Sequence, residues 1–330
     1  MEEAARFILD DTSLTSELKN LRHSISPKDI LVKTTHLGAR NAAADIGPTI
    51  SLGTAEPERN IVQAVIANAR RAQESLRVLE ELAKTTDTEL DGAGFQKTRF
   101  TIYALEKTLV GRLLRHDKAI LVRNLHAVVD TTSLGERSPA KVARDMLLGG
   151  ATVIHLRDNF TPKPQLLSIA SEIAELCLGY GALFIVDDAL DIALAANAGG
   201  LYLDQDSLPI SIVRKLLPID RIIGRSVSCV SEAKLAKDDG ADYLGCRADF
   251  ATAVKPDGHT PNCNVLAQIK KEVDLPLVAI GGITRYNVAE VLRLGADGVA
   301  VASAIINAAS AEGATCDFIK AMEVPYEPAQ

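Results

Sequence analysis

From Asn124 to the end of the chain, short apolar segments alternate with segments of helical spacing, and this alternation constrains the fold more than any other feature. Eight such units favour a closed parallel barrel over an open doubly wound sheet, and no G-x-G-x-x-G motif follows the first segment. The sequence therefore predicts an α/β fold with a (βα)8 TIM barrel at residues 121–330. Strands are expected near residues 125–129, 152–156, 183–187, 200–203, 221–224, 242–246, 276–280 and 297–301.

A mainly α-helical N-terminal domain is predicted for residues 1–120, and it carries an internal duplication. Residues 2–6 match residues 80–84, and residues 18–25 match residues 95–102. A repeat at this spacing indicates a duplicated helical hairpin.

The second copy is the more complete one. Residues 61–82 carry apolar side chains at helical spacing, and the first copy has no counterpart of residues 68–78. We therefore expect a start upstream of Met1. Residues 38–53 are expected to form an irregular loop between the copies, and residues 115–123 to link the domain to the barrel.

Composition narrows the class of protein. The net charge of −7 argues against broad contact with nucleic acid or anionic membrane, although a local pocket for small anions is allowed. The five cysteines form no C-x-x-C pair, which argues against a zinc site or a disulfide framework and favours a reducing cytoplasm. The sequence contains no secretory signal and no apolar stretch of membrane-spanning length. A cytoplasmic protein with no membrane partner is expected, and self-association is left open.

Small residues follow the seventh and eighth predicted strands. Gly281 and Gly282 come after one, and Ala302 and Ser303 after the other. Such turns leave backbone N–H groups uncovered where helices begin, which is how barrels bind phosphate. They predict an anion pocket.

Polar side chains follow most of the other predicted strands, at the rim where barrel enzymes carry their chemistry. Taken singly, each is more often a helix cap or a surface ion pair. Together they would suit Mg²⁺ and more than one phosphate group. These residues are His155, Arg157 and Asn159 after the second strand, Asp187 and Asp188 after the third, Asp204 to Ser207 after the fourth, Ser226 after the fifth, and Arg247, Thr252 and Lys255 after the sixth.

Five stretches at residues 184–205, 222–226, 240–245, 255–257 and 279–284 resemble thiamine-phosphate synthases, within a match covering about residues 124–308. The resemblance implies that the barrel joins hydroxymethylpyrimidine diphosphate to thiazole phosphate and releases pyrophosphate. It also implies a dissociative mechanism, in which Mg²⁺ and basic side chains stabilise the departing diphosphate and the thiazole nitrogen attacks a pyrimidine carbocation.

The resemblance assigns roles residue by residue. Ser226 and Lys255 would be catalytic, and Asp188 would bind Mg²⁺. Ser207 stands where the family usually has a second metal-binding Asp, so Asp206 is a candidate substitute. The implied substrate-binding residues are His155, Arg157, Asn159, Asp187, Ser226, Thr252, Lys255, Gly281, Gly282, Ala302 and Ser303.

The chain departs from that family mainly in the diphosphate half of the site. The family usually has Gln at His155, Lys at Asn159, Asn at Asp187 and Thr at Val254, and a Gly-Pro pair in place of Arg247-Ala248. Each lost charge-assisted contact costs roughly 1.5 to 3 kcal/mol, so two or three together would slow turnover by several orders of magnitude. His155 and Arg247 are the residues expected to compensate.

The helical domain resembles one fused ahead of this synthase in some bacteria and associated with hydroxymethylpyrimidine phosphate kinase activity. The likeness rests on Asn68-x-x-Arg71-Ala-x-Glu74-x-Leu-Arg77-x-x-Glu80, on Arg40 with Asp45-Ile-Gly47, and on Leu21-Arg22-His23. No G-x-x-x-x-G-K-[ST] loop is present. Composition alone favours a solvated face for the first of these segments.

Three hypotheses follow. The first is a synthase in the barrel, a transferase acting on small phosphorylated substrates. The second is a kinase in the helical domain beside a weakened or non-catalytic barrel. The third is a phosphate-ligand-binding protein without turnover.

Overall fold

The computed structural model describes residues 1–25, 60–85, 90–247 and 263–323 of this chain. Its contacts divide the chain into two units, Met1–His116 and Asp117–Gln330, near the boundary predicted after residue 120. Helix α5 (Gly92–Leu121) runs through most of the segment predicted as a linker. The two units divide inside that predicted linker, residues 115–123, but the chain there is helical as far as Leu121, because neither glycine nor proline interrupts the helix. The loop predicted at residues 38–53 lies outside the described residues.

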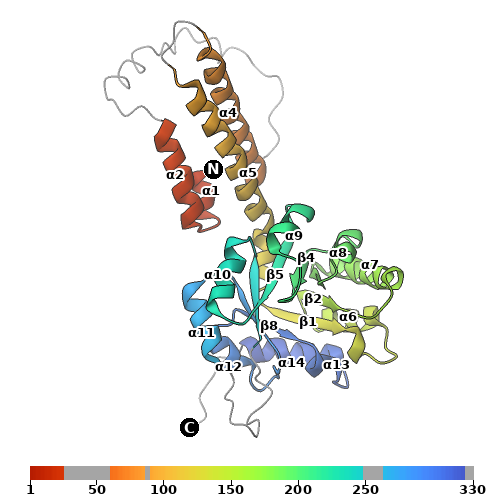
Figure 1. Ribbon diagram of the computed structural model, residues 1–330. Helices are drawn as coiled ribbons and strands as arrows, with labels where there is room; N and C mark the ends of the chain where they lie inside the picture. The colour runs from red at the N-terminus through yellow and green to blue at the C-terminus, as the bar shows by residue number, and fades with distance from the viewer. Residues whose placement is uncertain (26–59, 86–89, 248–262, 324–330) are drawn as a thin grey trace. The chain divides into compact units, whose positions relative to one another are not determined.

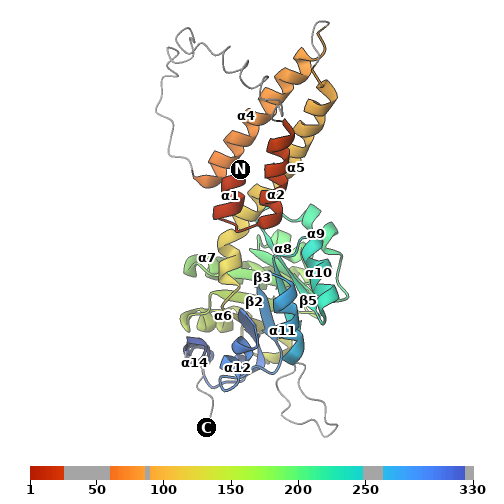
Figure 2. The same cartoon turned by 90° about the vertical axis from the view of Figure 1, so that its left-hand side faces the viewer.

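The helical unit contains α1 (Glu2–Phe7), α2 (Thr12–Ile25), α4 (Ile61–Leu82) and most of α5, as Figures 1 and 2 show. A capping box begins α4, in which Asn60 and Gln63 each accept a hydrogen bond from the other's backbone N–H. The predicted apolar stripe of α4 is buried at its centre and exposed at its ends. The buried apolar residues of this unit include Ala5, Leu14, Leu18, Val65, Ala69, Leu76, Ile102, Leu105 and Leu109.

Equivalent ion pairs support the predicted duplication. In the second copy, Glu80 on α4 pairs with Arg99 on α5 at 2.8 Å. In the first copy, Glu2 on α1 pairs with Arg22 on α2 at 3.0 Å, and these are the positions that the sequence repeat aligns. The Glu80–Arg99 pair is buried, whereas the Glu2–Arg22 pair is more exposed. Only the second copy therefore excludes water from the ion pair between its helices.

The barrel unit confirms the predicted (βα)8 fold. Eight parallel strands close in chain order, with β1 hydrogen bonded to both β2 and β8. The strands are β1 (Leu125–Asp130), β2 (Val153–Arg157), β3 (Leu183–Asp187), β4 (Gly200–Leu203), β5 (Ile222–Val227), β6 (Tyr243–Arg247), β7 (Leu277–Ile280) and β8 (Gly298–Val301). The helices are α6 (Pro139–Leu148), α7 (Lys163–Tyr180), α8 (Leu190–Ala195), α9 (Ile210–Leu216), α10 (Val230–Asp238), α11 (Cys263–Glu272), α12 (Val288–Arg293), α13 (Ser303–Ile306) and α14 (Ala311–Glu323), with a 3-10 turn at Thr131–Ser133.

Alternation along the strands separates two cores. On β1, for example, Ala127 and Val129 pack in the cluster shared with the helices, whereas Val128 packs inside the barrel. Several strands extend further than predicted. Ser226 therefore lies within β5 rather than after it, and Arg157 is the last residue of β2.

The barrel interior combines large rings with glycines. Tyr202 on β4 and Tyr243 on β6 stack at a centroid distance of 6.1 Å, and Gly224 lies between them in register on β5. A Cβ atom on Gly224 would come within 2.2 Å of the Tyr243 ring. Glycine is therefore required at this point for steric reasons.

We expect Gly224→Ala to destabilise the barrel by about 1 to 3 kcal/mol, because overpacking forces the Tyr243 ring or β5 to move. The urea midpoint of unfolding, followed by circular dichroism, measures the loss. Gly179→Ala on α7 is the control: its Cβ would meet nothing within 4 Å, so this variant should be at least as stable as the wild type. Equal midpoints for both variants would contradict the steric account.

None of the helices in the described part of the chain is both long enough and apolar enough to span a membrane.

Candidate active site

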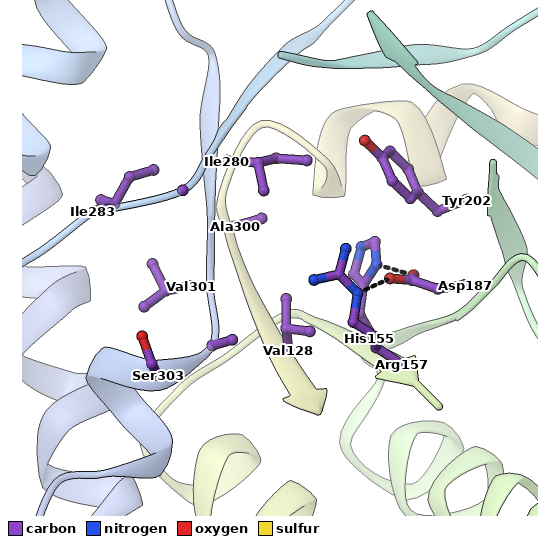
Figure 3. Close-up of a pocket in the computed structure, with 13 residues that line it drawn as sticks. Val128, His155, Arg157, Asp187, Tyr202, Ile280, Ile283, Ala300, Val301 and Ser303 are labelled. Atoms are coloured by element: carbon purple, nitrogen blue, oxygen red, sulfur yellow. Dashed lines mark hydrogen bonds and ion pairs between the residues drawn. The ribbon is translucent and has the colours of Figure 1, made fainter. Parts of the chain in front are cut away.

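A cavity of about 130 Å³ opens among the carboxyl ends of the strands; we call it the main cavity. Figure 3 shows His155, Arg157 and Asp187 grouped on one side of it and Ile283, Val301 and Ser303 on the other. Seven of the residues predicted to bind substrate line it together: His155, Arg157, Asp187, Gly281, Gly282, Ala302 and Ser303.

The predicted anion pocket is the glycine side of the main cavity. Gly281 and Gly282 have φ values of +100° and +63°, which side chains other than glycine rarely adopt. The Asn287 side chain holds this turn, because it donates to the Gly282 carbonyl at 3.0 Å and accepts from the Thr284 N–H at 2.7 Å. Beyond Ala302, the chain enters α13, whose first N–H groups are the kind that helices leave unpaired.

The charged side of the cavity is built around Asp187. One carboxylate oxygen is hydrogen bonded to Nδ1 of His155 at 2.8 Å, and the other lies 3.5 Å from Nε of Arg157. The related family usually has Asn at this position, so the carboxylate of Asp187 adds a negative charge to this side of the cavity. That carboxylate has a basic side chain next to each oxygen, and one of them is His155, which the sequence led us to expect as a compensating residue.

A second cavity, of about 290 Å³, adjoins the first and shares Arg157, Asp187 and Tyr202 with it. We call it the acidic cavity because five aspartates line it: Asp130, Asp158, Asp187, Asp188 and Asp204. Asn159 and Arg247, both singled out from the sequence, also line it.

Asp188 is the centre of the acidic cavity. Its φ of +57° is a left-handed conformation that is uncommon outside glycine and is concentrated at functional sites. Its Oδ1 accepts a hydrogen bond from the Asp204 N–H at 3.0 Å and another from the Ser207 hydroxyl. Ser207, one of the two positions predicted to bind the metal, is thus hydrogen bonded to the other, Asp188. Asp204, rather than the predicted substitute Asp206, lines the cavity with it.

Other carboxylates of the acidic cavity have structural partners. Burial by itself would raise the pKa of Asp158, but hydrogen bonds donated by Thr131, Thr161 and Phe160 lower it below its usual range. Asp158 therefore organises the loop after β2. Within the described residues, no group of three or more His, Cys, Asp or Glu side chains is arranged to hold a metal ion.

Ser226 does not line the main cavity, but it is hydrogen bonded to Tyr202, which does. Burial raises the pKa of the Tyr202 hydroxyl well above its usual value, and a hydrogen bond with Ser226 opposes that rise. The other predicted catalytic residue, Lys255, and the predicted phosphate ligand Thr252 lie outside the described residues.

Sequence reasoning missed two ring residues that shape this site, Tyr202 and His126. Tyr202 lines both cavities, and His126 lies directly behind His155, completely buried. The available signal was position, since both occupy inward-facing places on predicted strands. Burial lowers the pKa of His126 to about 3.

The buried His126 predicts a pH-dependent stability. Between about pH 6.5 and pH 3 the unfolded chain binds a proton at this histidine that the folded barrel does not, so stability falls as the pH falls. The slope from this one group reaches about 1.4 kcal/mol per pH unit. Urea unfolding between pH 4.5 and 7 should show a shallower loss for His126→Gln than for the wild type. His23→Gln, at an exposed position on α2, should leave the slope unchanged.

The barrel carries a glycine turn after β7, a helix start after β8, and arginine and carboxylates at the ends of β2 to β4. This combination is typical of enzymes that act on phosphorylated substrates. Comparison with known proteins gives the family. Residues 125–305 match the family described as thiamine monophosphate synthase, and residues 1–108 match the ThiD2 family. The chain belongs to the thiamine-phosphate synthase family, whose members are transferases of thiamine biosynthesis.

The relatives include proteins with both units. Over 323 residues the chain is 36% identical to the thiamine-phosphate synthase of Thermosynechococcus vestitus, covering 97% of this chain and 89% of that protein. The thiamine-phosphate synthase of Methanoculleus marisnigri is 46% identical over 185 residues, covering 56% of this chain and 87% of that protein. Among solved structures, thiamine phosphate pyrophosphorylase from Pyrococcus furiosus is similar with a TM-score of 0.56 and 35% identity, covering 62% of this chain and 98% of that one.

Proposed function

We propose that the barrel joins hydroxymethylpyrimidine diphosphate to thiazole phosphate, forming thiamine phosphate and pyrophosphate. The observation that carries this proposal is the main cavity. It brings the turn at Gly281 and Gly282 within the same small space as His155, Arg157 and Asp187. A transferase that joins two phosphorylated substrates needs two anion subsites facing one reaction centre.

In this proposal each side of the cavity binds one substrate. The turn at Gly281 and Gly282, with Ala302 and Ser303, takes the thiazole phosphate. Arg157 takes the diphosphate from the opposite side and stabilises the negative charge that develops as it leaves. Ser226 and Lys255 are proposed to assist that departure, and Asn159 and Thr252 to complete the two subsites.

The acidic cavity suits a Mg²⁺ ion that the substrate helps to hold. Asp188 offers a carboxylate with a hydroxyl, that of Ser207, next to it. Mg²⁺ is commonly bound by one or two carboxylates together with substrate phosphates and water, rather than by an all-protein cage. When bound there, Mg²⁺ would neutralise charge on the diphosphate. Arg247, which also lines this cavity, would add a second positive charge.

Calorimetric titration of the full-length protein tests the two-sided site. Thiazole phosphate should bind equally well with Mg²⁺ and with a chelator, because no metal ligand is proposed in its subsite. The diphosphate should bind at least about 10-fold more tightly with Mg²⁺. Diphosphate binding that ignores Mg²⁺ would contradict the metal proposal. Absence of binding by either compound would contradict the assignment of both sides.

A kinase reaction in the helical unit is the second candidate. Asn68, Arg71, Glu74 and Arg77 lie exposed along one part of α4, as a ligand-binding face requires. Arg77 also pairs with the exposed Glu81 at 2.8 Å, as on a solvated helix face, and with the buried Glu80 at 3.2 Å. Formation of the diphosphate from hydroxymethylpyrimidine phosphate and ATP, assayed without thiazole phosphate, separates these interpretations. Unchanged ATP would exclude the kinase.

A further inference from the structure

A chain of hydrogen bonds runs through the barrel interior and ends at the main cavity. Nε2 of His126 lies 2.8 Å from the carbonyl oxygen of Val122, and its Nδ1 lies 2.9 Å from Nε2 of His155. Nδ1 of His155 in turn lies 2.8 Å from Asp187. Of the two histidines, His155 lines the cavity, where Figure 3 shows its contact with Asp187.

The proton positions at the buried end follow from the partners. A carbonyl oxygen only accepts, so Nε2 of His126 carries a hydrogen and donates it to Val122. Burial keeps the His126 ring neutral, since it lowers the pKa of this group to about 3. Nδ1 of His126 is then a bare acceptor, and Nε2 of His155 must donate to it.

We propose that His126 is a positioning residue for the synthase site: by accepting a hydrogen bond from Nε2 of His155, it fixes that ring with Nδ1 facing Asp187. The proposal deepens the proposed function, and its activity test rests on that function. His126 touches neither substrate side of the cavity and acts only through His155.

The orientation of His155 affects Arg157 on the diphosphate side of the cavity, because both residues contact Asp187. Asp187 is held between His155 at 2.8 Å and Arg157 at 3.5 Å. While His155 keeps its shorter contact, Arg157 is only loosely engaged and remains available to an anionic ligand. Without His126, Nε2 of His155 loses its partner and only Asp187 orients the ring, so the ring could turn and Asp187 would be free to pair more closely with Arg157.

Two tyrosine rings, Tyr202 and Tyr243, also lie near the histidine pair, but the hydrogen-bond partner of Nε2 of His155 is His126. Tyr202 on β4 lies 5.8 Å from His155 between ring centroids, and Tyr243 on β6 lies 5.7 Å from His126. Burial raises the pKa of both tyrosines, so both hydroxyls stay neutral. The Tyr243 hydroxyl is buried without a hydrogen-bond partner among the described residues, so it offers a matched control.

Nitrogen-15 spectra of histidine-labelled full-length protein test the hydrogen-bond chain without any substrate. His126→Gln and His155→Gln assign the two rings. At neutral pH we expect a hydrogen on Nε2 of both rings and none on Nδ1 of His126, and Tyr243→Phe should preserve this pattern. A hydrogen on Nδ1 of His126, or its absence from Nε2 of His155, would overturn the proposal.

Kinetics then distinguish positioning from general stability. We expect His126→Phe to lower kcat/KM by about 10- to 100-fold. This is the range found when a metal-binding side chain loses the hydrogen-bond partner that orients it. In a background carrying His155→Gln and Asp187→Asn, whose two amides can pair with each other, the same change should cost less than about 2-fold. Equal losses in both backgrounds would show that His126 acts on the fold alone. A wild type without synthase activity would refute the proposed function, whereas the spectra would still decide the hydrogen-bond chain.

Discussion

Arg157→Gln should lower kcat/KM for thiamine phosphate formation by about 100- to 1,000-fold, the usual loss when a preorganised donor to developing negative charge is removed. Arg157 is the last residue of β2 and lines both cavities, and we propose that it binds the diphosphate. The change also removes one of the two basic partners of Asp187. Steady-state rates with each substrate varied in turn measure the effect.

Arg144→Gln is the control for this variant. Arg144 is exposed on α6, so the substitution removes the same charge without touching either cavity. Its rates should match those of the wild type. If Arg157→Gln were as active as this control, Arg157 would not be the diphosphate ligand.

Gly281→Val should raise the KM for thiazole phosphate by at least about 10-fold while changing the KM for the diphosphate much less. At a φ of +100°, a branched side chain strains the backbone by about 1 to 3 kcal/mol and displaces the N–H groups that would hold the phosphate. Initial rates at saturating diphosphate give the first value, and rates at saturating thiazole phosphate give the second.

Strain alone is controlled by Gly181→Ala. Gly181 also has a positive φ, of +66°, but it ends α7, lines neither cavity, and an added Cβ would meet nothing within 4 Å. This variant should lose some stability and keep both KM values. If both substrates lost affinity equally in Gly281→Val, the two sides of the main cavity would not be separate subsites.

The sequence predicted the barrel well because buried parallel strands and their helices have different apolar periods. Closure and strand order then follow from the number of units. The positions at strand ends followed from the same pattern, which is why Arg157, Asp187, Gly281 and Ser303 could be predicted to meet. In the structure they line one cavity.

Features that depend on register could not be predicted. His155 and Asp187 lie 32 residues apart in the chain, and nothing in the sequence around either residue predicts their hydrogen bond. The fit of Tyr243 against Gly224 depends on how β5 and β6 align. The helix through Arg115 was missed for a different reason. The change from a helical domain to a barrel suggested a linker there. Residues of ordinary helix propensity, however, continue α5 across this boundary as far as Leu121.

The central claim is that one cavity at the barrel rim holds both phosphorylated substrates and joins them. Its most direct test is a time course of the full-length enzyme with hydroxymethylpyrimidine diphosphate, thiazole phosphate and Mg²⁺, in which both products are quantified. We predict thiamine phosphate and pyrophosphate in equal amounts at every time point, and neither product when either substrate is omitted. Pyrophosphate without thiamine phosphate, or no product at high enzyme concentration, would contradict the claim.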